Sequence, residues 1–214
     1  ANIILINDQL PILIDSGFGS DAKDTEQLIK EVGVSPEELH LIVNTHYHSD
    51  HVGGNFYLQK KYGVSIAAHK WEADLINSCD PESCSAEWLD QPVEPYRVDT
   101  KLSDKDEINT GSRTLKVLHT PGHTLGHISL YEPEEEILIC GDLFHKNDIG
   151  WFYSKLIVSN AEDSFGNRQL LISWLSHAFF IDRQCHYRST VGLAKRKHLS
   201  GTVFTILQID RIDD

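Results

Sequence analysis

The sequence contains no methionine and only four cysteines among 214 residues. The cysteines (Cys79, Cys84, Cys140 and Cys185) match neither a zinc-ribbon nor a redox CxxC spacing, so we expect reduced thiols. The lack of methionine, even at position 1, leads us to expect that stretches of the natural protein are missing from this sequence. An N-terminal strand and parts of the C-terminal region are the expected losses.

The sequence also lacks an apolar run long enough to cross a bilayer, and it does not start like a signal peptide. Basic residues are scarce, with 19 Lys and Arg against 32 Asp and Glu and a net charge of −13. Such a surface repels phosphate backbones and anionic lipids, so neither nucleic acid nor membrane is an expected partner. The basic run Lys195-Arg196-Lys197 is most simply solvated surface. We expect a cytoplasmic protein with a small-molecule substrate, and a homo-oligomer is possible.

The pattern of apolar residues predicts an α/β protein made of one domain, 1–214, with two halves at about 1–100 and 101–214. Short apolar runs predict strands at Asn2–Ile6, Pro11–Asp15, Leu39–Asn44, Val64–Ala68, Asp106–Ile108, Thr114–Leu118, Ile128–Tyr131, Ile137–Cys140 and Phe179–Ile181. Helical spacing predicts helices at Asp21–Val32, Gly53–Tyr62, Lys70–Asn77 and Asp163–Ser176. The tail Leu199–Ile209 fits both patterns.

The strongest functional signal is the segment His46-Tyr47-His48-Ser49-Asp50-His51, which follows a predicted buried strand. In an extended chain His46 and His48 project to the same side, and a turn after them lets Asp50 and His51 face a neighbouring point. Neutral imidazoles and carboxylates are good metal ligands. The segment therefore predicts ligands for two metal ions, and so dense a group disfavours the plainer interpretation as a polar surface loop.

Two later strand ends supply further ligands, which a two-metal site requires. His123 lies in Thr120-Pro121-Gly122-His123-Thr124, and Asp142 follows Gly141 after the strand Ile137–Cys140. A glycine before each candidate permits close backbone approach, and a carboxylate can bridge two metals through its two oxygens. Gly-Asp alone usually marks a turn, but together with the other two motifs it indicates that Asp142 is a metal ligand.

These motifs together resemble the ordered motif set of the metallo-β-lactamase superfamily, and Asp15 in Leu13-Ile14-Asp15-Ser16-Gly17 matches its early aspartate. The string Thr-Pro-Gly-His-Thr-Leu-Gly-His, which begins at Thr120, resembles the branch around hydroxyacylglutathione hydrolase, or glyoxalase II. The likeness runs from about Asn2 to Phe152 and weakens beyond. It implies an αββα sandwich of two mixed β-sheets flanked by helices, with metals at the sheet edges.

The resemblance also implies which residues bind each metal. The first metal would be bound by His46, His48 and His123, the second by Asp50, His51 and a late histidine, and both would be bridged by Asp142. Asp15 would orient the metal-binding loop through hydrogen bonds. His186 is the favoured late histidine because it follows the strand Phe179–Ile181, although Cys185 stands where the family expects glycine. His177 and His198 rank lower.

This donor set predicts a binuclear metallo-hydrolase with two divalent ions, zinc first, with iron or manganese open. Two cations lower the pKa of a shared water, so hydroxide can attack a carbonyl, while Asp50 holds the nucleophile and passes a proton to the leaving group. The string at Thr120 favours a thioester or other small ester-like substrate, although no extended C-terminal helical domain for glutathione is evident.

Several alternatives stay open on the same fold. A lactonase, β-lactamase or phosphodiesterase would differ only in substrate, and the acidic charge disfavours nucleases. An iron-dependent sulfur dioxygenase would differ in metal, whereas a diiron oxygen-reducing protein expects glutamate where Ser49 and its neighbours offer none. A non-catalytic metal-binding module is the least favoured. Other histidines have simpler roles: His127 caps a strand or supports a ligand, His119 is hydrogen-bonded, and His69 and His145 flank loops near the cleft.

Overall fold

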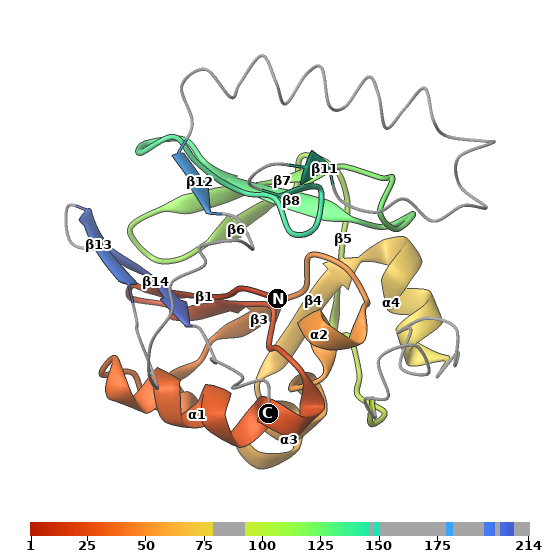
Figure 1. The fold of residues 1–214 in the computed structure, drawn as a ribbon, viewed down its shortest axis with the longest axis horizontal. Coiled ribbons are helices and arrows are strands. Elements are labelled where there is room, and N and C mark those ends of the chain that lie inside the picture. Colours follow the sequence, from red (N-terminus) through yellow and green to blue (C-terminus); the bar gives the residue numbers. More distant parts are fainter. Residues whose placement is uncertain (79–92, 146–147, 150–178, 182–194, 200–201, 208–214) are drawn as a thin grey trace.

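The structure is a computed structural model that describes residues 1–78, 93–145, 148–149, 179–181, 195–199 and 202–207. Two sheets lie face to face, and helices cover the outer face of the larger one (Figure 1). Within these ranges, no helix is long and apolar enough to span a membrane.

The larger sheet has seven strands in the order β13-β14-β1-β2-β3-β4-β5. Their bounds are β1 (Ile3–Asn7), β2 (Ile12–Ile14), β3 (Leu41–Val43), β4 (Ser65–His69), β5 (Thr100–Leu102), β13 (Lys195–Leu199) and β14 (Thr202–Leu207). β1 and β2, which correspond to the first two predicted strands, pair antiparallel. β1 also pairs antiparallel with β14, which resolves the ambiguous tail as strand. β2 to β5 run parallel, so their carboxyl ends lie at one edge.

The second sheet has five strands in the order β12-β9-β8-β7-β6. Their bounds are β6 (Glu107–Asn109), β7 (Thr114–His119), β8 (Ile128–Glu132), β9 (Ile137–Ile139) and β12 (Phe179–Ile181). β6 to β9 form an antiparallel meander, and β12 lies parallel to β9. A separate hairpin pairs β10 (Phe144–His145) with β11 (Asp148–Ile149).

Side chains alternate along the central strands because successive residues of a strand point to opposite faces. In β1, Ile4 and Ile6 join the core between the sheets, where they meet β7 and β8 through residues such as Val117 and Leu130. The intervening Ile3 and Leu5 belong to the core under the helices. β1 is therefore apolar throughout, as expected of a strand buried on both faces.

Among its described residues, the half of the chain that forms β1 to β5 contains four α-helices: α1 (Ala22–Glu31), α2 (Ser49–Val52), α3 (Asn55–Tyr62) and α4 (Lys70–Asn77). Leu28 of α1, Leu58 of α3 and Ile76 of α4 share one core with the outward side chains of the seven-stranded sheet. The predicted helix Lys70–Asn77 is confirmed. The predicted helix from Gly53 to Tyr62 begins instead at Asn55, with the separate short α2 before it.

Some predictions are corrected or fall outside the described residues. β5 carries two exposed polar side chains in three residues and was not predicted. The basic run at 195–197 lies within β13, a strand that was not predicted. The predicted helix Asp163–Ser176 lies outside the described residues, as do Cys79, Cys84 and Cys185, whereas Cys140 is buried.

Candidate metal centre

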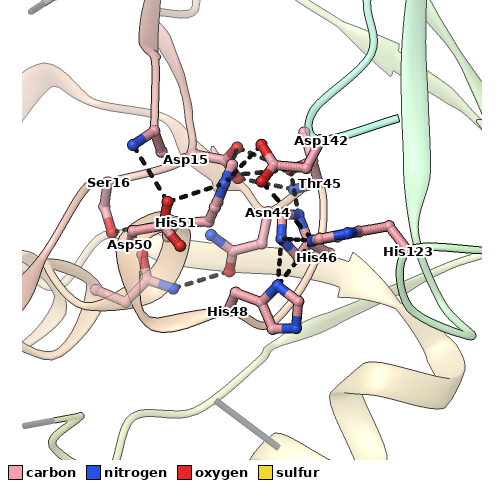
Figure 2. A network of polar contacts seen from close by, with 12 residues as sticks. Asp15, Ser16, Asn44, Thr45, His46, His48, Asp50, His51, His123 and Asp142 are labelled. Carbon is pink, nitrogen blue, oxygen red and sulfur yellow. Dashed lines mark hydrogen bonds and ion pairs between the residues drawn. The ribbon is translucent and has the colours of Figure 1, made fainter. Parts of the chain in front are cut away.

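Four strand ends converge on one cluster of polar side chains (Figure 2). β2 and β3 run parallel and end just before Asp15 and before His46. In the other sheet, β7 ends before the loop with His123, and β9 ends before Asp142. Segments far apart in the sequence are therefore brought together at one edge of the two sheets.

Three imidazole nitrogens form a compact triangle in this cluster. His46 Nε2 lies 3.0 Å from His48 Nδ1 and 3.1 Å from His123 Nε2, and the last two atoms are 2.8 Å apart. A nitrogen of a neutral imidazole either donates one proton or offers one lone pair, so three mutual contacts cannot all be good hydrogen bonds. The spacing is close to the roughly 3.3 Å that two Zn–N bonds of about 2.0–2.1 Å enclose at a tetrahedral angle.

A second group of ligands adjoins the first. His51 Nε2 lies 3.2 Å from Asp142 Oδ1 and 3.5 Å from Asp50 Oδ2. The other oxygen of Asp142 lies 3.7 Å from His123 Nε2, so this carboxylate faces both groups. His46, His51 and Asp142 bring one ligand atom each within 4.8 Å of one another. The geometry is what a carboxylate bridging two ions requires.

Asp15 and Thr45 fix the orientation of two histidines. The Asp15 carboxylate accepts hydrogen bonds from the Thr45 backbone N–H and from the Thr45 hydroxyl, both at 2.8 Å. Its Oδ2 also lies 2.7 Å from His51 Nδ1, and Thr45 Oγ1 lies 3.1 Å from His46 Nδ1. Because the Thr45 proton is used toward Asp15, Thr45 can only accept from His46. In their neutral forms both histidines therefore carry their proton on Nδ1 and turn the Nε2 lone pair toward the cluster.

The backbone around Asp15 is held in a conformation that ordinary side chains rarely adopt. Asp15 has a φ of 58° although it is not glycine. Its N–H donates to the Val43 carbonyl at 2.9 Å, and the N–H of Ser16 donates to the His51 carbonyl at 2.7 Å. These bonds tie the end of β2 to the end of β3 and to α2, and the left-handed conformation at Asp15 aims its carboxylate at Thr45 and His51.

The short helix α2 is placed by a close approach of two backbones. His48 precedes α2, which begins at Ser49 and contains Asp50 and His51. A Cβ added at Gly53 would lie 2.2 Å from the Gly19 nitrogen, so only glycine fits there. The tight packing of α2 against the turn at Gly19 explains why the predicted helix is interrupted before Asn55.

The electrostatics of the cluster differ between its two groups. Burial, together with the neighbouring imidazoles, lowers the pKa of His46 far below its ordinary value and that of His48 to about 3. These two histidines are neutral and have lone pairs to offer. Burial also opposes a charge on His51, but Asp50, Asp142 and Asp15 outweigh it and raise the pKa of His51 to about 10.

The donor set fits two divalent cations. Three carboxylates are at most 4% exposed here: Asp15, Asp50 and Asp142. Burying negative charge is unfavourable without compensating cations. His51 and the Ala1 ammonium, which lies 3.2 Å from Asp50 Oδ2, supply two positive charges for three carboxylates. The neutral triangle and the anionic group together match the mixed imidazole and carboxylate sets that transition metals prefer in hydrolytic enzymes.

The structure brings together the six residues predicted as ligands that fall in its described part: His46, His48, Asp50, His51, His123 and Asp142. Asp15 lies behind them, where it was expected. His186, the predicted late ligand, lies outside the described residues. Sequence reasoning missed Thr45 and the buried Glu72, neither of which belongs to a recognisable ligand spacing.

Comparison of the sequence with protein families matches residues 1–177 to the family described as the metallo-beta-lactamase superfamily. A hydroxyacylglutathione hydrolase of Pelagibacter ubique is 35% identical over 122 residues, which are 57% of this chain and 43% of that protein. An uncharacterized protein of Aquifex aeolicus is 34% identical over 149 residues, covering 65% of this chain and 70% of its own length. The chain thus spans less than half of the first of these relatives.

Solved structures show the same fold. A subclass B3 metallo-beta-lactamase of Bradyrhizobium japonicum matches with a TM-score of 0.63 and 25% identity, over 77% of this chain and 66% of that one. A metallo-beta-lactamase of Cronobacter sakazakii matches with a TM-score of 0.67 and 22% identity, over 80% and 64% of the two chains. The two face-to-face sheets with outer helices confirm the predicted fold class.

Proposed function

Because this chain belongs to the metallo-beta-lactamase superfamily, we propose that it is a binuclear metallo-hydrolase that cleaves a thioester or other small ester-like carbonyl. The observation that carries the proposal is the convergence of His46, His48 and His123 on one point, with Asp142 facing both this triangle and His51. Three chain segments contribute to this arrangement, and a structural role alone does not require it.

The two ligand groups assign a place to each ion. The triangle of imidazoles would bind the first ion, and His51 with Asp50 would bind the second. Asp142 would bind both ions, and His186 is the proposed last ligand of the second. Two divalent ions, zinc first, would supply a lowered water pKa and polarise the carbonyl of the substrate. The remaining tasks fall to the side chains of this chain.

Asp50 is the proposed proton carrier. Its Oδ2 lies 3.5 Å from His51 Nε2, and the residue is buried beside the other candidate ligands. A carboxylate in this position can accept a proton from the attacking water at Oδ2 and pass it to the leaving group. A small recess beside the site is lined by residues that include Asp15, His51 and Asp142.

The substrate class is supported by the relatives rather than by the pocket. The string that begins at Thr120 and a hydroxyacylglutathione hydrolase at 35% identity favour a thioester. A β-lactam or lactone is the second candidate, because a subclass B3 metallo-beta-lactamase shares the fold at 25% identity. Iron-dependent sulfur dioxygenation is a third, and metal analysis distinguishes it from hydrolysis.

The test combines metal analysis with a substrate panel. We expect two zinc ions per purified chain, and hydrolysis of a thioester in preference to a lactone or a chromogenic β-lactam. His48→Ala and Asp142→Asn should each lower turnover by several orders of magnitude, because each removes a ligand that the proposed chemistry requires. Near-normal turnover in either variant at matched metal content would contradict the assignment. One iron per chain would instead favour dioxygenation.

A further inference from the structure

The loop between β7 and β8 carries His123 and lies against helix α4. Two backbone hydrogen bonds close the loop on itself, from the Thr120 N–H to the His127 carbonyl at 2.9 Å and from the Gly122 N–H to the Thr124 carbonyl at 3.0 Å. Neither bond joins the loop to a neighbouring element. The position of His123 relative to the other ligands therefore depends on what the loop packs against.

Glu72 provides that external attachment. It lies in the first turn of α4 and is 1% exposed. Its Oε1 accepts a hydrogen bond from the Thr124 hydroxyl, and its carboxylate also accepts one from the Gly126 backbone N–H. Both donors belong to the loop, and Thr124 is the residue directly after His123. A single carboxyl group thus holds the loop at two points.

The backbones of the loop and α4 approach so closely that a side chain at position 126 does not fit. A Cβ added at Gly126 would lie 2.4 Å from Glu72 Cγ and 3.0 Å from His69 Nδ1. His119 adds a second attachment, because its ring stacks on His69 with centroids 4.2 Å apart and its Nε2 lies 2.9 Å from the Leu125 carbonyl oxygen. The loop is therefore clamped to the start of α4.

The clamp explains an otherwise unfavourable burial. Desolvation raises the pKa of Glu72 to about 8, and the hydrogen bond from Thr124 opposes this rise only in part. Its second oxygen, Oε2, is buried without a hydrogen-bond partner among the described residues. An apolar residue at this position would destabilise the helix packing less than a buried carboxyl group does. The carboxyl group is therefore explained by its two contacts with the loop.

We propose that Glu72 is a positioning residue, which fixes the His123 loop by accepting hydrogen bonds from Thr124 and Gly126 and so sets the affinity of the triangular metal site. The inference rests on the proposed metal centre. Residues that orient metal ligands from behind typically change affinity by about 10–100-fold when they are removed. Glu72 acts on His123 indirectly, because it holds the loop rather than the imidazole ring itself.

The experiment measures zinc affinity by competition with a chromogenic chelator, for the wild type, Glu72→Ala and Glu72→Gln. Glu72→Ala should weaken the affinity by roughly tenfold or more. Glu72→Gln keeps an acceptor oxygen for both donors, so it should stay within about threefold of the wild type. The visible spectrum of the Co²⁺ form reports the histidine environment directly, and it should change in Glu72→Ala but not in Glu72→Gln.

Glu132 supplies a matched control. It is also 1% exposed and accepts the backbone N–H groups of Glu134 and Glu135, but it lies at the end of β8 remote from the loop. Glu132→Ala should lower the unfolding temperature and leave zinc affinity and the Co²⁺ spectrum unchanged. An equal loss of affinity in Glu132→Ala, or an affinity in Glu72→Gln as weak as in Glu72→Ala, would overturn the inference.

The two proposals fail in different ways. If the wild type binds zinc and Glu72→Ala binds it equally well, the positioning role is wrong and the metal centre is unaffected. If the wild type binds neither zinc nor Co²⁺, the metal centre itself is wrong. Thr124→Val removes one donor with little change in volume, so it should lose less zinc affinity than Glu72→Ala. It also provides a second test of the inference if Glu72→Ala does not fold.

Discussion

At the scale of single residues, Asp15 determines which nitrogen of two histidines faces the metal centre. Its carboxylate accepts hydrogen bonds from the Thr45 backbone N–H, the Thr45 hydroxyl and His51 Nδ1. A chain of carboxylate, hydroxyl and imidazole leaves each Nδ1 protonated, so each Nε2 lone pair is available to a cation. Asp15 thereby fixes the tautomer and the ring orientation of two candidate ligands, His46 and His51.

Asp15→Asn is expected to weaken zinc affinity by about 10–100-fold. The amide has one acceptor oxygen, so its NH₂ group must face a donor that the carboxylate had accepted. Asparagine tolerates a φ of 58°, which means that the backbone conformation is a minor part of the effect. Chelator competition measures the loss.

Asp8→Asn is the matched control for this substitution. Asp8 also accepts two hydroxyl hydrogen bonds, from Thr110 at 2.6 Å and Ser112 at 2.8 Å, but it lies in the turn after β1. We expect Asp8→Asn to change stability without changing zinc affinity. Equal zinc affinity in Asp15→Asn and the wild type would contradict the role given to Asp15.

The sequence could predict that the six candidate ligands of the described residues lie together, because each stands in a motif at a strand end. Glu72 was not predicted, because in Lys70–Asn77 it occupies a helix position that an exposed glutamate would also occupy. Its burial is produced by Thr124, which is 52 residues away in the sequence. Thr45 was missed for a related reason: a lone hydroxyl becomes informative only when Asp15 is known to lie beside it.

At the scale of elements, the strands and helices were predicted where their patterns were local. The apolar runs of β1, β2, β3 and β4 and the whole of α4 were identified to within a residue or two. The tail was ambiguous because only its pairing with β1 selects strand over helix. The break between α2 and α3 was missed because it depends on the approach of Gly53 to Gly19 across the fold.

Gly53→Ala is expected to destabilise the protein by about 3 kcal/mol, because the added methyl group would meet backbone atoms that cannot rotate away. Its neighbours would be the Gly19 nitrogen at 2.2 Å and the Ser49 carbonyl oxygen at 2.7 Å. Since α2 carries Asp50 and His51, zinc affinity should fall together with the unfolding temperature. Calorimetry and chelator competition on the same samples measure both.

Gly33→Ala separates crowding from the general effect of replacing glycine. Gly33 has nothing within 4 Å of an added Cβ and a φ of +89°, so only the left-handed backbone is penalised. That penalty is about 1–2 kcal/mol, and zinc affinity should not change. If Gly53→Ala were as mild as Gly33→Ala and bound zinc normally, α2 would not be held by this contact.

At the scale of the whole molecule, the proposed metal centre draws its ligands from segments that follow strands of both sheets. His46, His48, Asp50 and His51 follow β3 of the seven-stranded sheet, whereas His123 and Asp142 follow strands of the five-stranded sheet. Between the sheets lies an apolar core that holds them together without any ion. The αββα class could be predicted from the resemblance, but the division of ligands between sheets required the strand order.

Removal of the ions should therefore lower the unfolding temperature of the whole chain, not of one half. An ion present at about a thousand times its dissociation constant stabilises the folded state by about 4 kcal/mol. For a chain of this length that corresponds to about 8–16 °C.

Glu26→Gln gives the control. Glu26 binds Lys61 at 2.7 Å and joins α1 to α3 away from the centre, so this substitution should lower the unfolding temperature by the same amount with zinc or chelator. Zinc and chelator samples that unfold at one temperature would show that the ions do not bridge the sheets.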